Sequence, residues 1–446
     1  MSFLLIFVVF VIYFMIIKNF EKLATSNLRR QLLSITEEGY KSINTTEAVK
    51  KAVRISKNRL IVQNKEFLLN KFNRIFVFAF GKAALESSDA LKAVLGDRVF
   101  KGLVIDVAQT PNNTKDDGKQ NNWIYFQATH PNVSEQNVKA AKETLKIINE
   151  LKEDDLVICS ISGGGSAIFE IPYNIDFELA AKIFKVMTKG GATIAELNTV
   201  RKHTSLVKGG QLAKHFYPAT IINLVFSDVP GDDLSVIASG PLVKDKTTVR
   251  DAHELLQKFD VLRQLKLNKI ELIETPKEDM FFKKITNFLV VSPKVALRAM
   301  KERAEVLGYE VKIYDDRFQG EARVIGSKAV EASKKGQCVL GAGESTVKIL
   351  GQGKGGRNQE MALSALLSIG ENQVFGSFAS DGHDFTDCAG AIVDSSTKLR
   401  ANNLGLNISG YLNNNDSFTF FEAVGDHVIT GLTGSNIADF FVCLKT

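Results

Sequence analysis

Three charged or glycine-rich segments of this sequence come directly after apolar runs that are typical of buried strands. Lys82 follows the first run, the loop 162–166 follows the second, and Asp228 follows the third. The carboxyl ends of parallel strands meet at one edge of a sheet, and ligands bind there in such folds. We therefore expect a cation, a glycine loop and a carboxylate to face one site, and these are the groups that phosphoryl transfer uses.

The loop has the sequence Ser-Gly-Gly-Gly-Ser and lies between a predicted strand at 156–161 and a helix. Glycines release backbone N–H groups, so the loop favours a phosphate, with a tight turn as the alternative. No Lys-Ser or Lys-Thr pair follows it, as a Walker A loop requires, and Ile168 takes the third glycine position of a dinucleotide fingerprint. The candidate phosphate-binding residues are Ser162, Gly163, Gly164, Gly165 and Ser166.

A second glycine-rich segment, 340–360, carries Lys354 and Arg357. We expect a short strand, a glycine turn, a second strand, a glycine-and-cation loop and a helix that begins near Asn358. Exposed N–H groups beside two positive charges would suit an anion at the start of that helix, and a solvated hairpin tip is the alternative. The loop glycines are Gly351, Gly353, Gly355 and Gly356.

Predicted strands and helices alternate along the chain, and the strands are continuous apolar runs. This pattern is typical of a parallel sheet covered by helices on both faces. At 446 residues the chain is too long for one ordinary core. We expect an α/β protein with domains at 30–280 and 285–446 behind an N-terminal segment at 1–29. The charged stretch 245–284 would be mostly helical and join the domains, and 418–422 would be a closing strand.

Composition limits the function. The 56 basic and 50 acidic residues give a net charge of +6 without a basic block, and no basic stretch interleaved with aromatic residues predicts a nucleic-acid groove. Six histidines without paired spacing argue against a zinc site. The four cysteines are far apart, which indicates a reducing compartment without disulfides.

The sequence begins with an apolar run of 15 residues, Phe3–Ile17, which is shorter than the ~20 residues that a membrane-spanning helix prefers. Basic residues follow the run, so it could anchor a body that stays in the cytoplasm. From Met15 onward the sequence is basic and nearly free of acidic residues, which is typical of a mitochondrial presequence. An extended gene model is a third explanation. We expect a cytoplasmic or mitochondrial protein whose membrane contact, if any, is through 3–17.

With these segments assembled, the chain resembles the glycerate 2-kinases, which have an N-terminal domain of the DUF4147 type and a C-terminal MOFRL domain. The resemblance covers the chain from about residue 30 to its end. It implies a Rossmann-like first domain, a smaller second α/β domain with a mixed sheet, and an active-site cleft between them. The motifs that carry it are FGKAA, ATHP, SISGGGSA, NTVRKHTSLVKGGQLA, SDVPGDDLSVIASGP, GAGESTVKILGQGKGGRNQE, SDGHDFTDCAGA and TGLTGSN.

The family pattern implies phosphorylation of the 2-hydroxyl of D-glycerate by ATP with Mg²⁺, giving 2-phosphoglycerate. Lys82 and Arg357 would stabilise charge from different domains, with hinge closure excluding water. Asp228 and Asp381 would be the acidic groups near substrate or metal. The partners would be D-glycerate and ATP, with the choice between monomer and homodimer left open. The candidates for anionic substrate groups are Arg201, Lys202 and Lys208.

The sequence departs from the family pattern in three places. The acidic loop 383–388 lacks a Gly-Pro pair, Leu432 replaces a usual proline, and the apolar N-terminus has no counterpart. Two other functions stay open at this point. One is a nicotinamide-dependent hydroxypyruvate reductase, against which the incomplete dinucleotide fingerprint argues. The other is a non-catalytic, membrane-anchored metabolite-binding protein.

Overall fold

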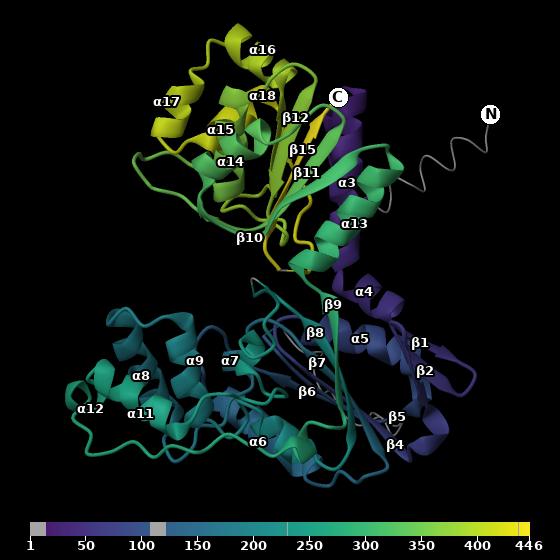
Figure 1. The fold of residues 1–446 in the computed structure, drawn as a ribbon, viewed down its shortest axis with the longest axis vertical. Helices are drawn as coiled ribbons and strands as arrows, with labels where there is room; N and C mark the ends of the chain where they lie inside the picture. Colours follow the sequence, from purple (N-terminus) through teal and green to yellow (C-terminus); the bar gives the residue numbers. More distant parts are fainter. Residues whose placement is uncertain (1–14, 108–121, 230, 436) are drawn as a thin grey trace. The chain divides into compact units, whose positions relative to one another are not determined.

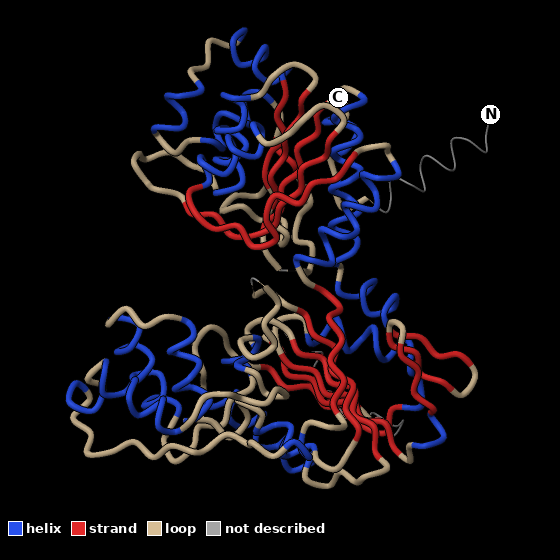
Figure 2. Tube along the Cα trace, in the orientation of Figure 1, coloured by secondary structure: helices blue, strands red, loops and turns tan. Residues whose placement is uncertain are grey.

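The structure is a computed structural model that describes residues 15–107, 122–229, 231–435 and 437–446. The chain forms two compact units (Figure 1). The first comprises Thr45–Val290, and the second combines the residues up to Asn44 with Val291–Thr446. Within the described residues, each unit holds one six-stranded sheet and its helices (Figure 2). The prediction of two α/β domains is therefore confirmed.

The large sheet of the Thr45–Val290 unit has the strand order β6-β5-β4-β7-β8-β9. Its first five strands in this order pair in parallel. All residues of β7 are buried, as the continuous apolar run predicts for a strand covered on both faces. The strands are β4 (Arg74–Phe80), β5 (Val99–Asp106), β6 (Trp123–Gln127), β7 (Asp155–Ile161), β8 (Thr220–Phe226) and β9 (Ile285–Val291).

Aromatic side chains fill the core of this sheet. The Phe78 ring lies 5.3 Å from the Phe80 ring and 5.2 Å from the Phe169 ring, centroid to centroid. Around the sheet lie α4 (Thr45–Ala52), α5 (Ala84–Leu95), α6 (Glu135–Ile148), α7 (Gly165–Ile168) and α10 (Gln211–Phe216). A small antiparallel sheet precedes it, formed by β1 (Val53–Ser56), β2 (Arg59–Val62) and β3 (Lys65–Leu68).

Four further helices of this unit gather beside the sheet around a small core of their own (Figure 1). They are α8 (Phe177–Lys189), α9 (Ile194–His203), α11 (Val249–Lys258) and α12 (Val261–Gln264). A capping box between Thr193 and Glu196 fixes the start of α9. The stretch 245–284 was predicted to be mostly helical, but after α12 it holds only a short 3₁₀ turn, η4 (Asp279–Phe281). Its helices pack on α8 and α9, within the unit rather than between units.

The sheet of the second unit is mixed, as expected, with the strand order β10-β11-β15-β12-β13-β14. Strands β10 and β11 are parallel, and the other neighbours are antiparallel. Helices α3 (Asn27–Ile43) and α13 (Pro293–Val306) cover one face, and α14 (Ala322–Glu331) and α15 (Arg357–Ser368) cover the other (Figure 1). The strands are β10 (Glu310–Glu321), β11 (Gln337–Thr346), β12 (Gln373–Phe378), β13 (Gly390–Asp394), β14 (His427–Val428) and β15 (Asp439–Lys445).

Two predictions of local structure in this unit were wrong. The expected strand 418–422 lies in helix α18 (Ser417–Val424), because Phe420, Phe421 and Val424 are spaced to bury one helical face. The expected strand–turn–strand at 337–346 is a single strand. Gly341 lies inside that strand, and a Cβ there would come within 2.4 Å of the Phe441 ring. The remaining helices are α2 (Phe20–Leu23), α16 (Ser395–Asn403) and α17 (Ile408–Asn413).

The described part of the N-terminal segment belongs to the second unit rather than to a separate targeting segment. The side chain of Arg29 is 1% exposed and binds two carboxylates. Its Nε donates to Oδ2 of Asp394 at 2.6 Å, and its Nη1 donates to Oδ1 of Asp426 at 2.8 Å. Burial alone would raise the pKa of Asp394, but the hydrogen bonds and charge of Arg29 hold it at about 2. The chain therefore divides differently from the predicted boundaries at residues 29 and 285.

Residues before Arg29 are also integrated. The Glu37 carboxylate accepts hydrogen bonds from the backbone N–H groups of Ile16 and Ile17, at 2.7 and 3.0 Å. Ile17, Phe20 and Leu23 are all buried. This packing is an observation against the presequence, one of the three explanations left open for the N-terminus, and the choice among them stays a prediction. The rest of the predicted apolar run, residues 3–14, lies outside the described residues, and no helix among the described ones is long and apolar enough to cross a membrane.

Replacing Arg29 by Gln should destabilise the protein strongly, because two buried carboxylates would lose their cation. We expect a loss of about 3–5 kcal/mol in the free energy of unfolding at pH 7. The ionised form of Asp394 is favoured in the folded state, so this contribution is present above its unfolded pKa of about 4 and disappears as the pH falls toward 2. Urea unfolding of the full chain at pH 7 and pH 3 measures both effects.

The matched control is Arg30→Gln, since Arg30 forms only an exposed ion pair with Glu21. Such pairs contribute about 0–1 kcal/mol. Equal losses in the two variants would contradict the buried role of Arg29.

Candidate functional site

A cavity of about 1030 Å³ lies in the Thr45–Val290 unit, beside the carboxyl ends of β7 and β8. Helices α8 and α9 form another part of its wall. Of the residues predicted from the sequence, five line this cavity: Gly163, Gly164, Ser166, Arg201 and Asp228.

The loop after β7 approaches both Lys82 and Asp228. A Cβ on Gly163 would lie 2.0 Å from Oδ2 of Asp228, so only glycine lets this carboxylate lie against the loop backbone. The carbonyl of Gly163 accepts a hydrogen bond from the Lys82 backbone at 3.0 Å. The aliphatic stem of Lys82 is close to Gly164, where a Cβ would lie 3.1 Å from its Cγ. The structure thus brings the predicted cation, glycine loop and carboxylate together.

Ser162 and Gly165 shape the loop and are not among the cavity residues. Ser162 Oγ accepts a hydrogen bond from the backbone N–H of Ala83 at 3.0 Å. Gly165 packs against Ala238, whose Cβ would be 2.9 Å from a Cβ at that position. Helix α7, which follows, is a single turn, so the helix expected after the loop adds little dipole to an anion site.

A row of hydrogen bonds connects the loop to α9. The hydroxyls of Ser166 and Ser239 lie 2.8 Å apart, and Ser239 donates to Oδ1 of Asn198 at 2.8 Å. Ala238 and Ser239 have left-handed backbone angles, with φ of 50° and 63°. Such angles are unfavourable for residues other than glycine and persist where the surrounding structure enforces them, often at functional sites. Asn198 and Ser239 both lie inside motifs quoted for the family resemblance, but neither was predicted as a site residue because its uncharged side chain carries no distinct signal there.

Arg201 is a cation at the cavity wall. Its Nη1 donates to Oδ1 of Asn198 at 3.2 Å, and its guanidinium lies 4.7 Å from the centroid of the Phe184 ring. Burial lowers the pKa of Arg201, and the charge of Glu170 opposes this effect. A half-buried guanidinium beside a cavity is suited to an anionic ligand, which would replace the water that the charge has lost.

Lys208 was predicted to bind substrate, but it is fully buried beneath the loop. Its ammonium donates to the carbonyl oxygens of Gly165, at 2.9 Å, and Phe169. Burial lowers the pKa of Lys208 to about 8, although the charge of Glu170 raises it in part. Glu170 in turn accepts a hydrogen bond from the Ser205 hydroxyl at 2.5 Å. Lys208 therefore holds the loop in place from behind.

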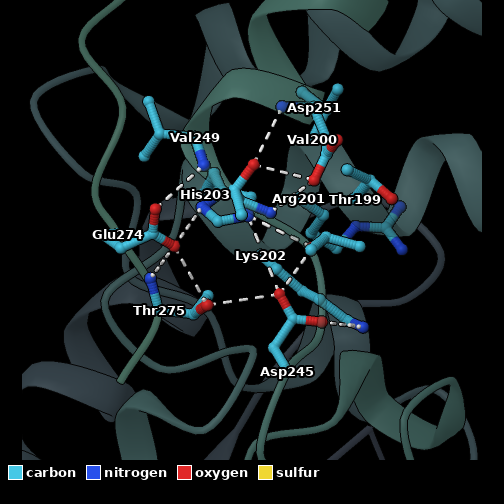
Figure 3. Close-up of polar contacts among 12 residues, drawn as sticks. Thr199, Val200, Arg201, Lys202, His203, Asp245, Val249, Asp251, Glu274 and Thr275 are labelled. Carbon is cyan, nitrogen blue, oxygen red and sulfur yellow. Dashed lines mark hydrogen bonds and ion pairs between the residues drawn. The ribbon is translucent and has the colours of Figure 1, made fainter. Parts of the chain in front are cut away.

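Lys202 also has a structural role, although it was predicted to contact substrate. Its ammonium lies 2.9 Å from Oδ1 of Asp245, and both side chains are buried. Figure 3 shows this pair within a network around His203 and Thr275. Adjacent residues of a helix point about 100° apart, so α9 can place Arg201 at the cavity and Lys202 in the interior.

In the second unit, a smaller cavity of about 360 Å³ is lined by Arg357, Asp381, Asp384 and Asp439, among other residues. Nε of Arg357 lies 2.5 Å from Oδ2 of Asp439, and its Nη2 donates to Oδ1 of Asp439 at 3.2 Å. Burial opposes the charge of Arg357, but Asp439 and Glu344 outweigh it and raise its pKa. Asp381 is half-buried and accepts a hydrogen bond from the His383 backbone at 2.9 Å.

The predicted anion loop before Arg357 uses its backbone N–H groups internally. Leu350 and Gly351 donate to the side chain of Asn415, Gln352 and Gly353 donate to Asn414, and Lys354 donates to Asp416. The loop is thus bound to residues 414–416 of its own chain. For Gly351 and Gly353, the prediction that the loop exposes these donors to a phosphate was therefore wrong.

The start of α15 is occupied as well. Asp384 accepts hydrogen bonds from the backbone N–H groups of Asn358 and Gln359, at 3.1 and 2.9 Å. Cβ atoms on Gly355 and Gly356 would collide with Ser417 and Asp384, at 2.1 Å in both cases. These two glycines permit close packing around a buried carboxylate that caps the helix, and their role in binding phosphate stays a prediction.

Asp439 is a site residue that the sequence analysis missed, because it is a single acidic residue at the start of an apolar run. It is 2% exposed. Burial raises the pKa of Asp439 to about 7, and Arg357 lowers it in part. This carboxylate determines how Arg357 is held.

Among the described residues, no group of three or more histidine, cysteine or acidic side chains is placed to hold a metal ion. Mg²⁺ bound to a nucleotide needs only one or two protein carboxylates, because phosphates and water complete its coordination. Asp228 and Asp381, each at a cavity of its own unit, are compatible with that limited role.

Two family models match the chain: a domain of unknown function, DUF4147, at residues 31–274, and the MOFRL family at residues 337–439. A glycerate 2-kinase of Pyrococcus horikoshii is 36% identical over 445 residues, which cover 94% of this chain and 98% of that protein. The chain belongs to the glycerate 2-kinase family. The resemblance inferred from the motifs is confirmed.

A solved structure and a differently named relative complete the comparison. The crystal structure of a glycerate kinase from Thermotoga maritima has a TM-score of 0.79 at 33% identity, covering 93% of this chain and 98% of that one. A putative hydroxypyruvate reductase of Agrobacterium vitis is 35% identical over 385 residues, covering 82% of this chain and 86% of that protein. Members of this glycerate 2-kinase family therefore carry two functional names.

The effect of Asp439→Asn on stability should depend on pH. The folded state raises the pKa of Asp439 to about 7 and so favours its protonated form. The stability that the protonated side chain contributes is fully present below the pKa of the unfolded state, about 4, and is lost as the pH rises through 7. The asparagine variant has no such titration. Relative to wild type, it should therefore be more stable at pH 8 than at pH 5. Urea unfolding at the two pH values measures this difference, and a constant difference would rule out the raised pKa.

Proposed function

We propose that this protein transfers the γ-phosphoryl group of ATP to the 2-hydroxyl of D-glycerate, giving 2-phosphoglycerate and ADP. The observation that carries the proposal is the approach of Asp228 to Gly163 of the glycine loop, with Lys82 beside the loop and Arg201 at the same cavity. Phosphoryl transfer depends on positioned charge rather than on a covalent nucleophile, and this site supplies charge of both signs. Membership of the glycerate 2-kinase family supports the same activity.

In this proposal, the charged groups at the glycine loop have distinct roles. Asp228 accepts the proton of the attacking hydroxyl, as a carboxylate does in general base catalysis. The cations Lys82 and Arg201 attract the anionic groups of the substrates. The loop Gly163–Ser166 lies against the transferring phosphoryl group. Lys208 acts behind this surface by fixing the loop, and the charge of Glu170 at the cavity wall supports the charged form of Lys208.

The second unit would contribute Arg357 and Asp381. Arg357 is a transition-state donor in this proposal, and its ion pair with Asp439 orients it. Mg²⁺ bound to ATP would neutralise phosphate charge, and the candidate carboxylates to hold it are Asp228 in the first unit and Asp381 in the second.

The alternative activity, hydroxypyruvate reduction with a nicotinamide cofactor, has less support from the site. A dinucleotide fingerprint requires a third glycine that allows a long helix to pack closely on the strand. Here Ile168 takes that position, and α7 is only one turn long. The names of the Agrobacterium vitis relatives are the only observation in favour of the reductase.

A product-identified assay tests the proposed activity directly. The full-length protein, incubated with D-glycerate, ATP and Mg²⁺, should form 2-phosphoglycerate, which enolase converts to phosphoenolpyruvate in a coupled absorbance measurement. In a parallel reaction, NADH should not be consumed with hydroxypyruvate. Formation of 3-phosphoglycerate alone, or NADH consumption without phosphorylation, would overturn the proposal.

Asp228→Asn should lower kcat by about 10²-fold or more, because an amide cannot accept the hydroxyl proton. KM should change less than kcat, since the amide keeps the shape of the carboxylate. Asp233→Asn is the matched control, because Asp233 is exposed and its Oδ1 accepts only the Ser235 backbone N–H, which an amide oxygen also does. A kcat of the Asp228 variant equal to that of the control would remove Asp228 from the catalytic role.

A further inference from the structure

Helix α8 has two apolar faces, and only one of them is covered by other helices. Leu179, Ile183 and Met187 lie in the small core that α8 shares with α9, α11 and α12. A surface helix that packs on one side normally presents polar residues on the other. On α8 the second side carries Phe177, Ala180, Ala181, Phe184 and Thr188, and this stripe lines the large cavity. Phe184 lies at its edge, because it also packs against the small core.

Two aromatic side chains border this stripe, and we call the part of the α8 wall between Phe177 and Phe184 the α8 slot. Phe177 and Phe184 are seven residues apart, so about 10 Å of helix separates them at a rise of 1.5 Å per residue. Ala180 and Ala181 lie between them and present only methyl groups. Both phenylalanines are half-buried and Ala181 is exposed, so the slot is open from the cavity side.

The cavity is also larger than the proposed acceptor needs. Its volume of about 1030 Å³ is at the upper end of the ~300–1,000 Å³ that drug-sized ligands occupy, whereas D-glycerate has three carbons. The polar groups assigned to small anions in the proposed reaction are grouped at the glycine loop, Asn198 and Arg201. The α8 wall is the part of the cavity that the proposed reaction does not yet use.

We infer that the α8 slot binds the purine base of the nucleotide that donates the phosphoryl group, an inference that rests on the proposed kinase activity. Aromatic side chains stack on bases with little dependence on sequence or ring type. Arg201 stacks on Phe184 and is hydrogen-bonded through Asn198 toward Ser166, so it lies between the slot and the loop. The phosphate chain of a nucleotide whose base lies in the slot would extend past Arg201 to the glycine loop.

Charge at the cavity rim agrees with this assignment. Lys182 and Lys185 are exposed on α8 and line the same cavity. Their positive charge would attract a nucleotide, although Glu178 on the same helix reduces it. A second copy of this chain could also cover an apolar helix face, but it would not explain why the slot continues into a cavity lined by Arg201 and Asp228.

The test fills the slot without removing a charged group. Ala181→Trp should weaken ADP binding to the full-length protein by about tenfold or more in isothermal titration with ADP and Mg²⁺, because the indole occupies the place of the base. The KM for ATP should rise in parallel, while the KM for D-glycerate should stay within about twofold. Ala195→Trp is the matched control, since Ala195 is exposed on α9 and does not line the cavity.

Covalent labelling locates the base independently of the variant. 8-Azido-ATP, photolysed on the wild-type protein and mapped by mass spectrometry, should label peptides that contain residues 177–188 or 194–201, and excess ADP should suppress this labelling. Labelling confined to the second unit would overturn the inference. So would an unchanged ADP affinity of Ala181→Trp in a protein with a normal circular dichroism melting curve.

The possible outcomes distinguish a failure of the inferred base-binding slot from a failure of the proposed reaction. If ADP binds and Ala181→Trp weakens it, but no phosphorylated glycerate forms, the proposed function fails and the nucleotide slot stands. If 2-phosphoglycerate forms while Ala181→Trp binds ADP normally, the function stands and the slot fails. A change in molecular mass of Ala181→Trp in light scattering, with normal ADP affinity, would assign the stripe to self-association and overturn the inference.

Discussion

The register of the parallel sheet determines where the candidate site can form. Phe80 of β4 pairs with Ile161 of β7, and Ile161 pairs with Val225 of β8. The three strands therefore end at the same level, and the residues that follow them meet at one edge. A register shift of β7 by two residues would move the glycine loop about 7 Å along the strand direction and separate Gly163 from Asp228.

The features that could be predicted from the sequence are those that local pattern determines. Continuous apolar runs identified the buried parallel strands, and their ends located Lys82, the glycine loop and Asp228. In contrast, Arg201 and Lys202 are neighbours in one motif, and no local feature distinguishes a cavity residue from a buried one there. Their different environments result from the helical turn of α9 and from Asp245, which lies 43 residues away from its partner Lys202.

Long-range partners account for the other differences. The glycines before Arg357 have the composition of an anion loop, but their N–H groups are bound to a segment more than 60 residues further along the chain. Likewise, the sequence around Arg29 is typical of a presequence, and only the structure shows its carboxylate partners, which lie 365 and 397 residues away. Asp439 and Arg357 are 82 residues apart. No local pattern carries information about such pairs.

The pairing of the N-terminal helices with the second unit bears on the order in which the protein can be made. Strand β15 ends one residue before the C-terminus and lies in the middle of its sheet, between β11 and β12. This strand is synthesised after all its neighbours in the sheet, so the sheet of the second unit cannot close before β15 has been made. Helix α3 is synthesised before the whole Thr45–Val290 unit. Its buried face, which includes Leu32, Leu33 and Ile35, has no sheet to cover it until β12 and β15 have been made. The Thr45–Val290 unit is complete much earlier and can fold while the chain is still growing. During that interval the nascent chain presents an uncovered amphipathic helix, which is the kind of segment that chaperones bind.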